Sequence, residues 1–368
     1  MIAGPVDLTT IAHGGVCVGR IGGRVVFVRG GIPGERVMLN ITDTSKKSYW
    51  RGEVIEVLTA SADRIIPACA VADRCGGCDY QHISLTRQRE LKTQVIAEQL
   101  SRLAGVDYEI EVEDVGIPLG WRTRMRYHRG PGGYGLLASR SREVVNLPAK
   151  GCLIAHPKGR DLAAFSSDKD TLKVTIADSG IAINGNPKVV TEQVLGREYI
   201  VSSEGFWQVH PKAAEVLVTA VLQGLEPKPG ETALDLYCGV GLFAGFLTDA
   251  GTKVVGIESD KTAIGFARKN IPGAKFRIGD VAKVLQQQKL SADLVVLDPP
   301  RSGAGKKVVN ELLKIRPRRI AYVACDPAGL ARDLKLFLAS DYKILEIRAF
   351  DLFPMTHHVE CVALLARK

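Results

Sequence analysis

The feature that most constrains the fold of this chain is a regular alternation of strand and helix patterns from residue 231 to the C-terminus. Buried-strand patterns occur at 231–237, 253–259, 274–280, 291–300, 318–327, 342–350 and 358–367. Helix patterns at 242–251 and 260–270 separate the first three of them. Such alternation indicates a parallel sheet with helices on both faces, which binds ligands at the carboxyl ends of its strands. We therefore predict a doubly wound, Rossmann-like α/β domain with its site along one rim.

The turn after the first of these strands, DLYCGVGLF, indicates a nucleoside ligand. It keeps Gly239 and Gly241 but lacks the third glycine of the GxGxxG turn that receives a pyrophosphate. Glu258 ends the second strand, where it can accept hydrogen bonds from ribose hydroxyls, and Asp280 ends the third, within reach of an adenine edge. Together with Asp235 this order predicts S-adenosylmethionine as the cofactor. The alternative is that Asp235 and Glu258 are ordinary cap or turn residues.

The fourth strand ends in LDPPR (297–301), where two prolines stiffen the turn that carries Asp298. Methyltransferases that act on exocyclic amines place an aromatic residue after such a proline pair, whereas this chain has Arg301. The difference favours methylation at a carbon atom, and carbon 5 of uracil is the carbon that we consider.

Carbon 5 of uracil is too weak a nucleophile to accept a methyl group unaided. A thiolate that adds to carbon 6 activates carbon 5, and a base must later remove the carbon 5 proton so that the thiol can leave. Cys325 ends the fifth strand and Glu360 begins the last, on the same predicted rim as Asp298. We therefore predict that Cys325 is the nucleophile and Glu360 the base. The alternatives are a buried structural thiol and a surface carboxylate.

A second group of cysteines lies earlier in the chain. Cys69, Cys75 and Cys78 occur in ACAVADRCGGC, and Cys152 follows much later. Eight cysteines are too few to form a disulfide scaffold in 368 residues, so clustered ones indicate a metal site. Four thiolates suit a tetrahedral zinc ion or an iron–sulfur cluster equally well, and spacing alone does not distinguish them. The other cysteines, Cys17, Cys238 and Cys361, we assign to packing or to the cofactor turn.

The N-terminal half of the chain shows two further regions. Glycine-rich residues 1–58 contain short strand patterns and no helix pattern, which indicates a small OB-like β-barrel. Residues 59–200 combine the cysteines, a helix pattern at 84–105 and short strands, which predicts a mixed α+β domain. The net charge of +9 favours a polyanionic partner, although a basic enzyme of small molecules has the same charge.

WRTRMRYHR (121–129) is the clearest basic feature. At strand periodicity Arg122, Arg124, Arg126 and His128 share one face, which would suit phosphate contacts, while the other face would suit a core. The alternative is an edge strand protected by charge.

Five motifs together resemble one family. They are FWQVHP (206–211), LDLYCGVG (234–241), LDPPRSG (297–303), ACDPAGLARDL (324–334) and FDLFPMTHHVECV (350–362). They are similar to the successive signatures of the S-adenosylmethionine-dependent RNA uracil-5-methyltransferases, which form 5-methyluridine in tRNA and ribosomal RNA. Residues 11–35 resemble the TRAM domain of that family, an OB-like RNA-binding barrel. The resemblance covers nearly the whole chain.

The resemblance implies a role for each predicted site residue. Around the cofactor or the pocket it implies Gln208, Tyr237, Glu258, Asp280 and Asp298. It implies Cys325 as the nucleophile and Glu360 as the base. It further implies a structural 4Fe-4S cluster on Cys69, Cys75, Cys78 and Cys152. The domains would be a TRAM barrel at 1–58, a central domain at 59–200 and a class I methyltransferase domain at 201–368. Three positions depart from the family: Asp326 stands where Asn is more frequent, Gly329 where Thr is usual, and Met355 where a polar residue is common.

The expected partner is structured RNA, from which a uridine is flipped into the pocket. The barrel together with the four cysteines favours 23S ribosomal RNA, and tRNA is the alternative. Two other classes stay open: an amine-directed methyltransferase, and a non-catalytic RNA-binding protein with a relic cofactor site. Because no stretch resembles a signal peptide or approaches about 18 apolar residues, we expect a cytoplasmic protein without a membrane segment, and we expect a monomer.

Overall fold

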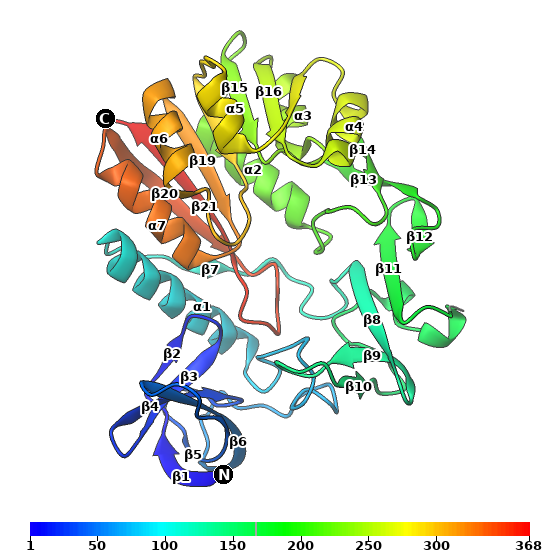
Figure 1. Ribbon diagram of the computed structural model, residues 1–368, viewed down its shortest axis with the longest axis vertical. Coiled ribbons are helices and arrows are strands. Elements are labelled where there is room, and N and C mark those ends of the chain that lie inside the picture. The colour runs from blue at the N-terminus through cyan, green and yellow to red at the C-terminus, as the bar shows by residue number, and fades with distance from the viewer. Residues whose placement is uncertain (166–167) are drawn as a thin grey trace.

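The computed structural model describes residues 1–165 and 168–368 of the chain. An N-terminal barrel, a central region and a C-terminal α/β part follow one another along the sequence (Figure 1). No helix in the described residues is both long and apolar enough to span a bilayer.

Six short strands form the barrel sheet in the order β1-β5-β6-β4-β3-β2. They are β1 (Ile2–Asp7), β2 (Thr10–Ala12), β3 (Val16–Ile21), β4 (Arg24–Arg29), β5 (Arg36–Asp43) and β6 (Tyr49–Thr59). Side chains alternate between core and solvent, so Val26, Val28, Val37 and Leu39 are fully buried. The fully buried Glu35 accepts two hydrogen bonds from Arg64, each 2.6 Å long, which fix the barrel to the segment that follows.

Helix α1 (Leu85–Gln99) lies between the barrel and the C-terminal part (Figure 1). It begins at Ser84, whose side chain accepts a hydrogen bond from the Arg87 amide, and continues as a π-helical turn, η1 (Leu100–Ala104). Gly105 ends it in the left-handed conformation. The helix predicted at 84–105 is thus confirmed. The next strand, β7 (Val112–Glu113), leaves the central region and joins the edge of the C-terminal sheet.

The central region contains an antiparallel sheet and a hairpin. The sheet order is β10-β9-β8-β11-β12, from β8 (Arg124–Gly130), β9 (Gly133–Leu137), β10 (Val144–Asn146), β11 (Thr171–Ala177) and β12 (Gly180–Ile183). The hairpin pairs β13 (Val189–Val194) with β14 (Arg197–Ser202). Two short 3-10 turns, Pro157–Gly159 and Leu162–Ala164, lie between β10 and β11.

The predicted alternation around β8 holds, but the predicted phosphate-binding face does not hold as a whole. Trp121, Met125 and Tyr127 are buried in the core. On the other face Arg124 is nearly buried and forms an ion pair of 3.1 Å with Glu192, because an unpaired guanidinium would be costly there. Arg126 is exposed and remains available to a partner.

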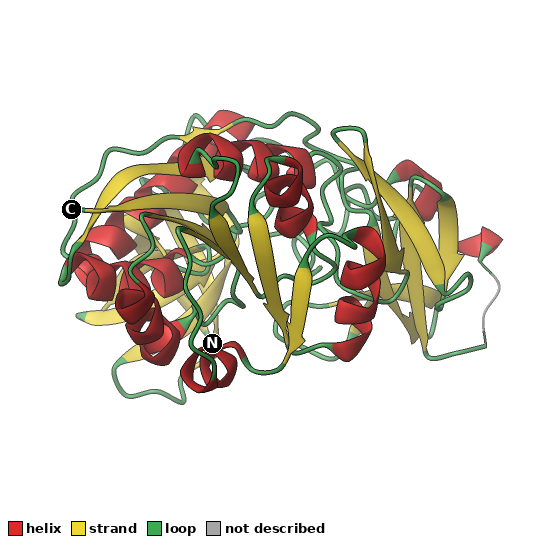
Figure 2. Cartoon of the chain, turned by 90° about the horizontal axis from the view of Figure 1, so that it is seen from above, coloured by secondary structure: helices red, strands yellow, loops and turns green. Residues whose placement is uncertain are grey.

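The C-terminal part is built on an eight-stranded sheet of order β17-β16-β15-β18-β19-β21-β20-β7. Its strands are β15 (Thr232–Leu236), β16 (Lys253–Glu258), β17 (Lys275–Ile278), β18 (Leu294–Leu297), β19 (Arg319–Ala324), β20 (Tyr342–Phe350) and β21 (Glu360–Arg367). Its helices are α2 (Ala213–Leu225), α3 (Leu242–Asp249), α4 (Lys261–Asn270), α5 (Val281–Gln287), α6 (Gly305–Ile315) and α7 (Pro327–Leu338). One core packs α2, α3 and α4 against the sheet, and another packs α5, α6 and α7 on the opposite face. Helices therefore flank the sheet on both sides (Figure 2).

One prediction about this sheet was wrong. The last strand is not parallel to the others: β21 runs antiparallel to both β19 and β20. A loop of residues 351–359, without a helix, connects β20 to β21 and allows this reversal, whereas a parallel strand would need a longer crossover. The reversal brings the first residue of β21 to the rim where the parallel strands end.

Candidate active site

The reversed strand brings the predicted nucleophile and base together. Ala324 pairs with Cys361 in the register of β19 and β21, so Cys325 and Glu360 are the next opposed positions. Asp298 directly follows β18, the other neighbour of β19. The charges of Glu360 and Asp298 each raise the pKa of Cys325, and the charge of Asp298 also raises that of Glu360. The three residues therefore lie at one place on the rim.

Burial controls the charge of the two carboxyl groups. Only 4% of Glu360 is exposed, and burial raises its pKa well above the ordinary value, with a further rise from the Asp298 charge. Burial likewise raises the pKa of Asp298 to about 7. Arg301 opposes this effect at Glu360 by lowering its pKa. The pair is therefore suited to hold and release a proton near neutral pH.

The thiol of Cys325 responds to the same neighbours. Burial, together with the charges of Glu360, Asp298 and Asp326, raises its pKa to about 12, although Arg301 lowers it. Cys325 is thus protonated in the free enzyme, and attack requires that its proton move to a nearby base. In the sequence, Arg301 is notable only because it stands where amine-directed methyltransferases have an aromatic residue. In the structure it supplies the positive charge that acts on Cys325.

The glycine turn after β15 is held by buried polar and packing contacts. Asp235 is fully buried, and its Oδ2 accepts a hydrogen bond of 2.8 Å from the Ala244 amide in α3. Its Oδ1 has no hydrogen-bond partner among the described residues, and burial raises its pKa to about 8. Gly241 is required, because a Cβ there would lie 2.4 Å from the Ile271 side chain and its φ is +91°.

The other predicted cofactor residues differ in their position relative to this turn. Glu258 accepts hydrogen bonds from the amides of Gly239 (3.3 Å) and Asp260 (2.8 Å), which fixes it beside the turn. Asp280 caps α5 by accepting from Lys283, also at the end of its strand. Tyr237 starts the turn, partly buried. Gln208 lies half-buried between β14 and α2, and makes no hydrogen bond with the others among the described residues.

A cavity of about 120 Å³ lies beside Cys325, and its walls come from segments far apart in sequence. Cys325, Asp326 and Arg301 form the catalytic side, and Lys92 of α1 and the barrel residue His13 lie on other sides. Neither Lys92 nor His13 belongs to a motif that the sequence predicts to be functional. Only HGG (13–15), a turn signal next to a titratable side chain, could have drawn attention to that segment.

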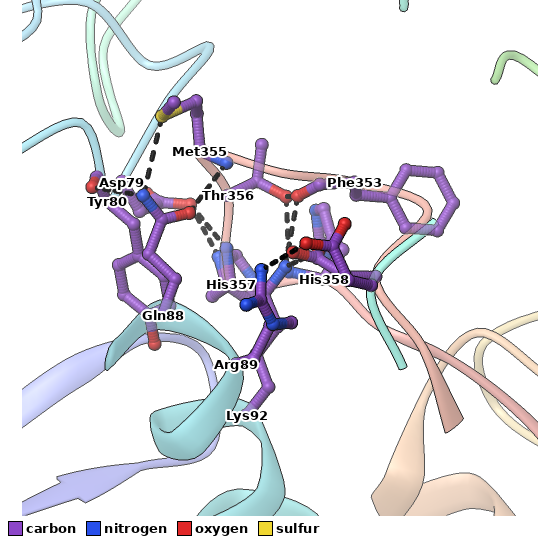
Figure 3. A network of polar contacts seen from close by, with 12 residues as sticks. Asp79, Tyr80, Gln88, Arg89, Lys92, Phe353, Met355, Thr356, His357 and His358 are labelled. Atoms are coloured by element: carbon purple, nitrogen blue, oxygen red, sulfur yellow. Dashed lines mark hydrogen bonds and ion pairs between the residues drawn. The ribbon is translucent and has the colours of Figure 1, made fainter. Parts of the chain in front are cut away.

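The loop before Glu360 is held by buried polar contacts with α1 (Figure 3). Lys92 Nζ donates to Asp351 Oδ1 at 2.6 Å and to the Phe353 carbonyl at 3.1 Å, and both charged side chains are buried. Gln88 accepts from the Met355 amide at 2.9 Å. These contacts fix the direction from which the chain enters β21.

The same loop contacts the cysteine segment. The amides of Asp79 and Tyr80 both donate to the Met355 carbonyl at 3.0 Å. His357 Nδ1 lies 2.6 Å from Asp79 Oδ2 (Figure 3). Met355 itself is buried in a left-handed conformation, so this departure from the family's polar residue is a packing position. The residue after Cys78 is thereby connected to the loop that leads to Glu360.

The four predicted cluster cysteines are all buried. Three of them lie in this segment, and Cys152 comes from further along the chain. Cys75 is influenced electrostatically by Cys69 and Cys152, and Cys78 by Cys75 and Cys152. N–H groups face the sulfurs: Gly77 donates to Cys75 at 3.4 Å, and Gln81 to Cys78 at 3.2 Å. In residues 1–165 and 168–368, no three His, Cys, Asp or Glu side chains are grouped so as to hold a single metal ion.

Comparison with known families gives matches in the barrel and in the α/β part. Residues 277–368 match the model of the tRNA (Uracil-5-)-methyltransferase family, residues 211–320 that of the methyltransferase small domain, and residues 5–55 that of the TRAM domain. An uncharacterized RNA methyltransferase of Streptomyces avermitilis is 44% identical over 98% of this chain and 97% of its own length. One from Streptomyces coelicolor is 42% identical over 98% and 92%.

Among solved structures, the fold matches that of the Pyrococcus abyssi tRNA (uracil-54, C5)-methyltransferase, solved in complex with S-adenosyl-L-homocysteine. The TM-score is 0.77 over all of both chains, at 24% sequence identity. The α/β methyltransferase fold and the N-terminal TRAM barrel are therefore confirmed. Since identity to relatives extends over nearly the entire length, this chain belongs to the S-adenosylmethionine-dependent RNA uracil-5-methyltransferase family.

Proposed function

We propose that this enzyme methylates carbon 5 of a uridine in structured RNA, with Cys325 as nucleophile and Glu360 as base. The observation that carries the proposal is the register of β19 and β21, which sets Glu360 opposite Cys325 with Asp298 on the neighbouring strand end. Uracil methylation needs a thiol and a base on the same side of one pocket. An amine-directed enzyme needs neither group.

The residues of the chain act in three steps. The Cys325 thiol adds to carbon 6 as its proton passes to the Asp298–Glu360 pair, in which burial raises the pKa of both carboxyl groups and so favours proton uptake. Bound S-adenosylmethionine would supply its sulfonium methyl group, which carbon 5 takes up as S-adenosyl-L-homocysteine is released. The proton taken from the thiol passes from the carboxyl pair to solvent. Glu360 then removes the carbon 5 proton, and the Cys325 sulfur leaves carbon 6 as a thiolate while the ring double bond is restored.

S-adenosylmethionine fits the hydrogen-bond acceptors that the structure presents at the glycine turn. The unpartnered Asp235 Oδ1 is a buried acceptor at the glycine turn, and Glu258 is oriented beside it. In this proposal Glu258 binds the ribose hydroxyls and Asp280 the adenine edge. Gln208, Tyr237 and Asp298 complete the site on the side of the methyl group.

The four cysteines are proposed to hold a 4Fe-4S cluster with a structural role. Four buried thiolates suit a zinc ion or an iron–sulfur cluster, and the choice of the cluster comes from the resemblance of the chain to its family. Buried thiols that influence one another and face N–H donors suit such a cluster.

The RNA substrate is proposed to be 23S ribosomal RNA, bound in part by the TRAM barrel. The barrel in combination with four cysteines supports this choice. A tRNA substrate is the second candidate, because the family model that matches residues 277–368 is named for tRNA. Mapping 5-methyluridine in total RNA from a deletion strain decides between them: the modified position that disappears identifies the substrate.

The catalytic proposal is tested with RNA that carries 5-fluorouridine, which cannot lose its carbon 5 substituent to a base. Wild-type enzyme should form a covalent adduct that survives denaturing electrophoresis. Cys325→Ala should form no adduct and should not transfer a methyl group. Cys17→Ala, which removes a buried thiol from the barrel core, is the matched control and should form the adduct. Turnover by Cys325→Ala would refute the assignment.

A further inference from the structure

The turn between β2 and β3 of the barrel reaches the active site. Gly15 in this turn lies against His357, so closely that a Cβ on it would be 2.3 Å from the His357 Cβ. Its φ of +75° is also one that other residues rarely adopt. Only glycine therefore allows the barrel to approach the catalytic loop this closely, and the contact is a built feature of the fold.

His13, in the same turn, forms a direct contact beside the nucleophile. Its Nε2 lies 2.8 Å from Oδ2 of Asp326, the residue that follows Cys325. The other carboxylate oxygen of Asp326 accepts from the Gly329 amide at 2.8 Å and caps α7. The His13 side chain is 42% exposed and that of Asp326 19%. Both line the cavity of Cys325, so the pair lies at its mouth.

The charge of this pair matters because the substrate is a polyanion. An unpaired Asp326 carboxylate would repel the phosphates that flank the target uridine. It would also disfavour the Cys325 thiolate, since Asp326 raises the pKa of that thiol. The shared hydrogen bond raises the pKa of His13 above 6.5 and lowers that of Asp326, so the pair is favoured in its charged, mutually neutral form.

Other charged groups face His13 and modify this balance. They are Arg332 of α7, which lowers its pKa, and Glu98 of α1, which raises it, together with Lys92, Arg301 and His357 around the same cavity. The nearest and strongest partner is Asp326. The protonated form of His13 therefore persists to higher pH than that of an ordinary histidine.

We propose that His13 is a positioning residue for methyl transfer, which cancels the charge of Asp326 at the mouth of the pocket and so admits the phosphates beside the target uridine. The barrel thus shapes the catalytic pocket itself, in addition to binding RNA elsewhere. The inference rests on the proposed function, because it takes RNA as the molecule that reaches Cys325. It also gives a reason for the departure at position 326: the Asn that is more frequent there has no charge to cancel.

The test is a double-mutant cycle with methyl transfer to 23S ribosomal RNA fragments and tRNA transcripts. His13→Ala should raise the KM for the RNA on the order of tenfold, the cost of leaving a like charge at the rim. In an Asp326→Asn background, where Asn still caps α7, the same change should cost less than twofold. His13→Gln keeps a hydrogen-bond donor without the charge, and it should resemble His13→Ala.

The pH dependence gives a second readout. In the wild type the KM should rise as pH increases through the raised pKa of His13, because deprotonation uncovers the Asp326 charge. In His13→Ala the KM should be high throughout and should lack this ionisation. Arg36→Ala, which removes an exposed barrel cation paired with Asp7, controls for lost positive charge and should change the KM less than twofold.

Two outcomes would overturn the inference. Equal losses from His13→Ala in both backgrounds, with a lowered melting temperature, would mean that the pair is only a structural contact. An unchanged KM in all His13 variants would mean that the pair has no influence on RNA. Both are distinguishable from failure of the proposed function, in which wild-type enzyme would form no adduct with 5-fluorouridine RNA.

Discussion

Cys325 at the pocket and Cys78 in the cysteine segment have similarly raised pKa values but differ in their neighbours. Burial raises the pKa of Cys325 and that of Cys78 each to about 12. Around Cys325 stand carboxyl groups, a guanidinium and a cavity. Around Cys78 stand the Gln81 amide and other thiols. Arg29 donates hydrogen bonds to the backbone carbonyls of Cys75 and Cys78. A perturbed pKa therefore does not identify a nucleophile, whereas the nearby proton acceptors do.

The sharpest test of this difference removes the carboxyl group that we propose as the base beside Cys325. Glu360→Gln should lower turnover by about 10²–10⁴-fold, the usual contribution of general base catalysis, and should accumulate a covalent protein–RNA intermediate. Denaturing gels with unmodified RNA detect this intermediate. Glu346→Gln, at an exposed position on β20, is the matched control and should turn over normally. Normal turnover by Glu360→Gln would place the base elsewhere.

The next largest effect concerns the buried ion pair between Lys92 of α1 and Asp351 of the loop that leads to Glu360. Lys92→Met removes one partner of a buried ion pair and should lower the free energy of unfolding by about 3–5 kcal/mol, because Asp351 is left buried and unpaired. Urea denaturation measures the loss. Lys343→Met, at an exposed position on β20, should change stability by less than about 0.5 kcal/mol. Similar midpoints for both variants would contradict the role of Lys92.

A smaller effect is expected within the cysteine segment. Cys78→Ala leaves the Gln81 amide without its sulfur acceptor and should lower stability by about 1–3 kcal/mol. Iron content should fall with it, while methyl transfer persists at temperatures well below the melting point. If Cys78→Ala instead abolished methyl transfer at full stability, the cysteine segment would take part in the chemistry, and the contrast with Cys325 would be lost.

The smallest effect is a shift along the pH axis. Arg301 lowers the pKa of Cys325, so Arg301→Gln should raise that pKa and move the alkaline rise of kcat/KM to higher pH. Arg29→Gln removes the corresponding cation from the cysteine segment and should leave the profile in place, although it lowers stability. A pH–rate series on both variants makes the comparison, and equal shifts would show that Arg301 has no special relation to the thiol.

Much of the α/β part could be predicted because strand and helix periodicity is a local property of sequence. Each predicted buried strand there coincides with an observed one, from β15 to β21. The direction of β21 could not be predicted in this way, since an apolar run has the same pattern in either direction. The prediction that Cys325 and Glu360 share a rim was consistent only with the antiparallel arrangement that the structure has.

The walls of the pocket were beyond local reasoning for a different reason. His13 and Asp326 are separated by 313 positions, and Lys92 and Asp351 by 259, so no spacing rule joins them. Arg124 illustrates the opposite case, a residue that was predicted to contact phosphates but is paired within the protein. The sequence of its own strand does not reveal the Glu192 carboxylate that packs against it. Tertiary pairing decides the role of such charges. The roles assigned to the catalytic, cofactor and cluster residues, and the domain boundaries, stay predictions.

Strand β7 has only two residues, yet it completes the edge of the large sheet. Val112 and Glu113 pair with Ala349 and Phe350, and Glu113 forms an ion pair with Arg348 at 2.8 Å. A ribosome makes β7 long before β20, so this early segment must wait for its neighbour until synthesis is almost finished. A fragment that starts at residue 201 would lack both β7 and α1, and its uncovered edge would favour aggregation. The methyltransferase part is therefore not a portable module, and transplanting it to another RNA-binding partner would require residues 85–113 to travel with it.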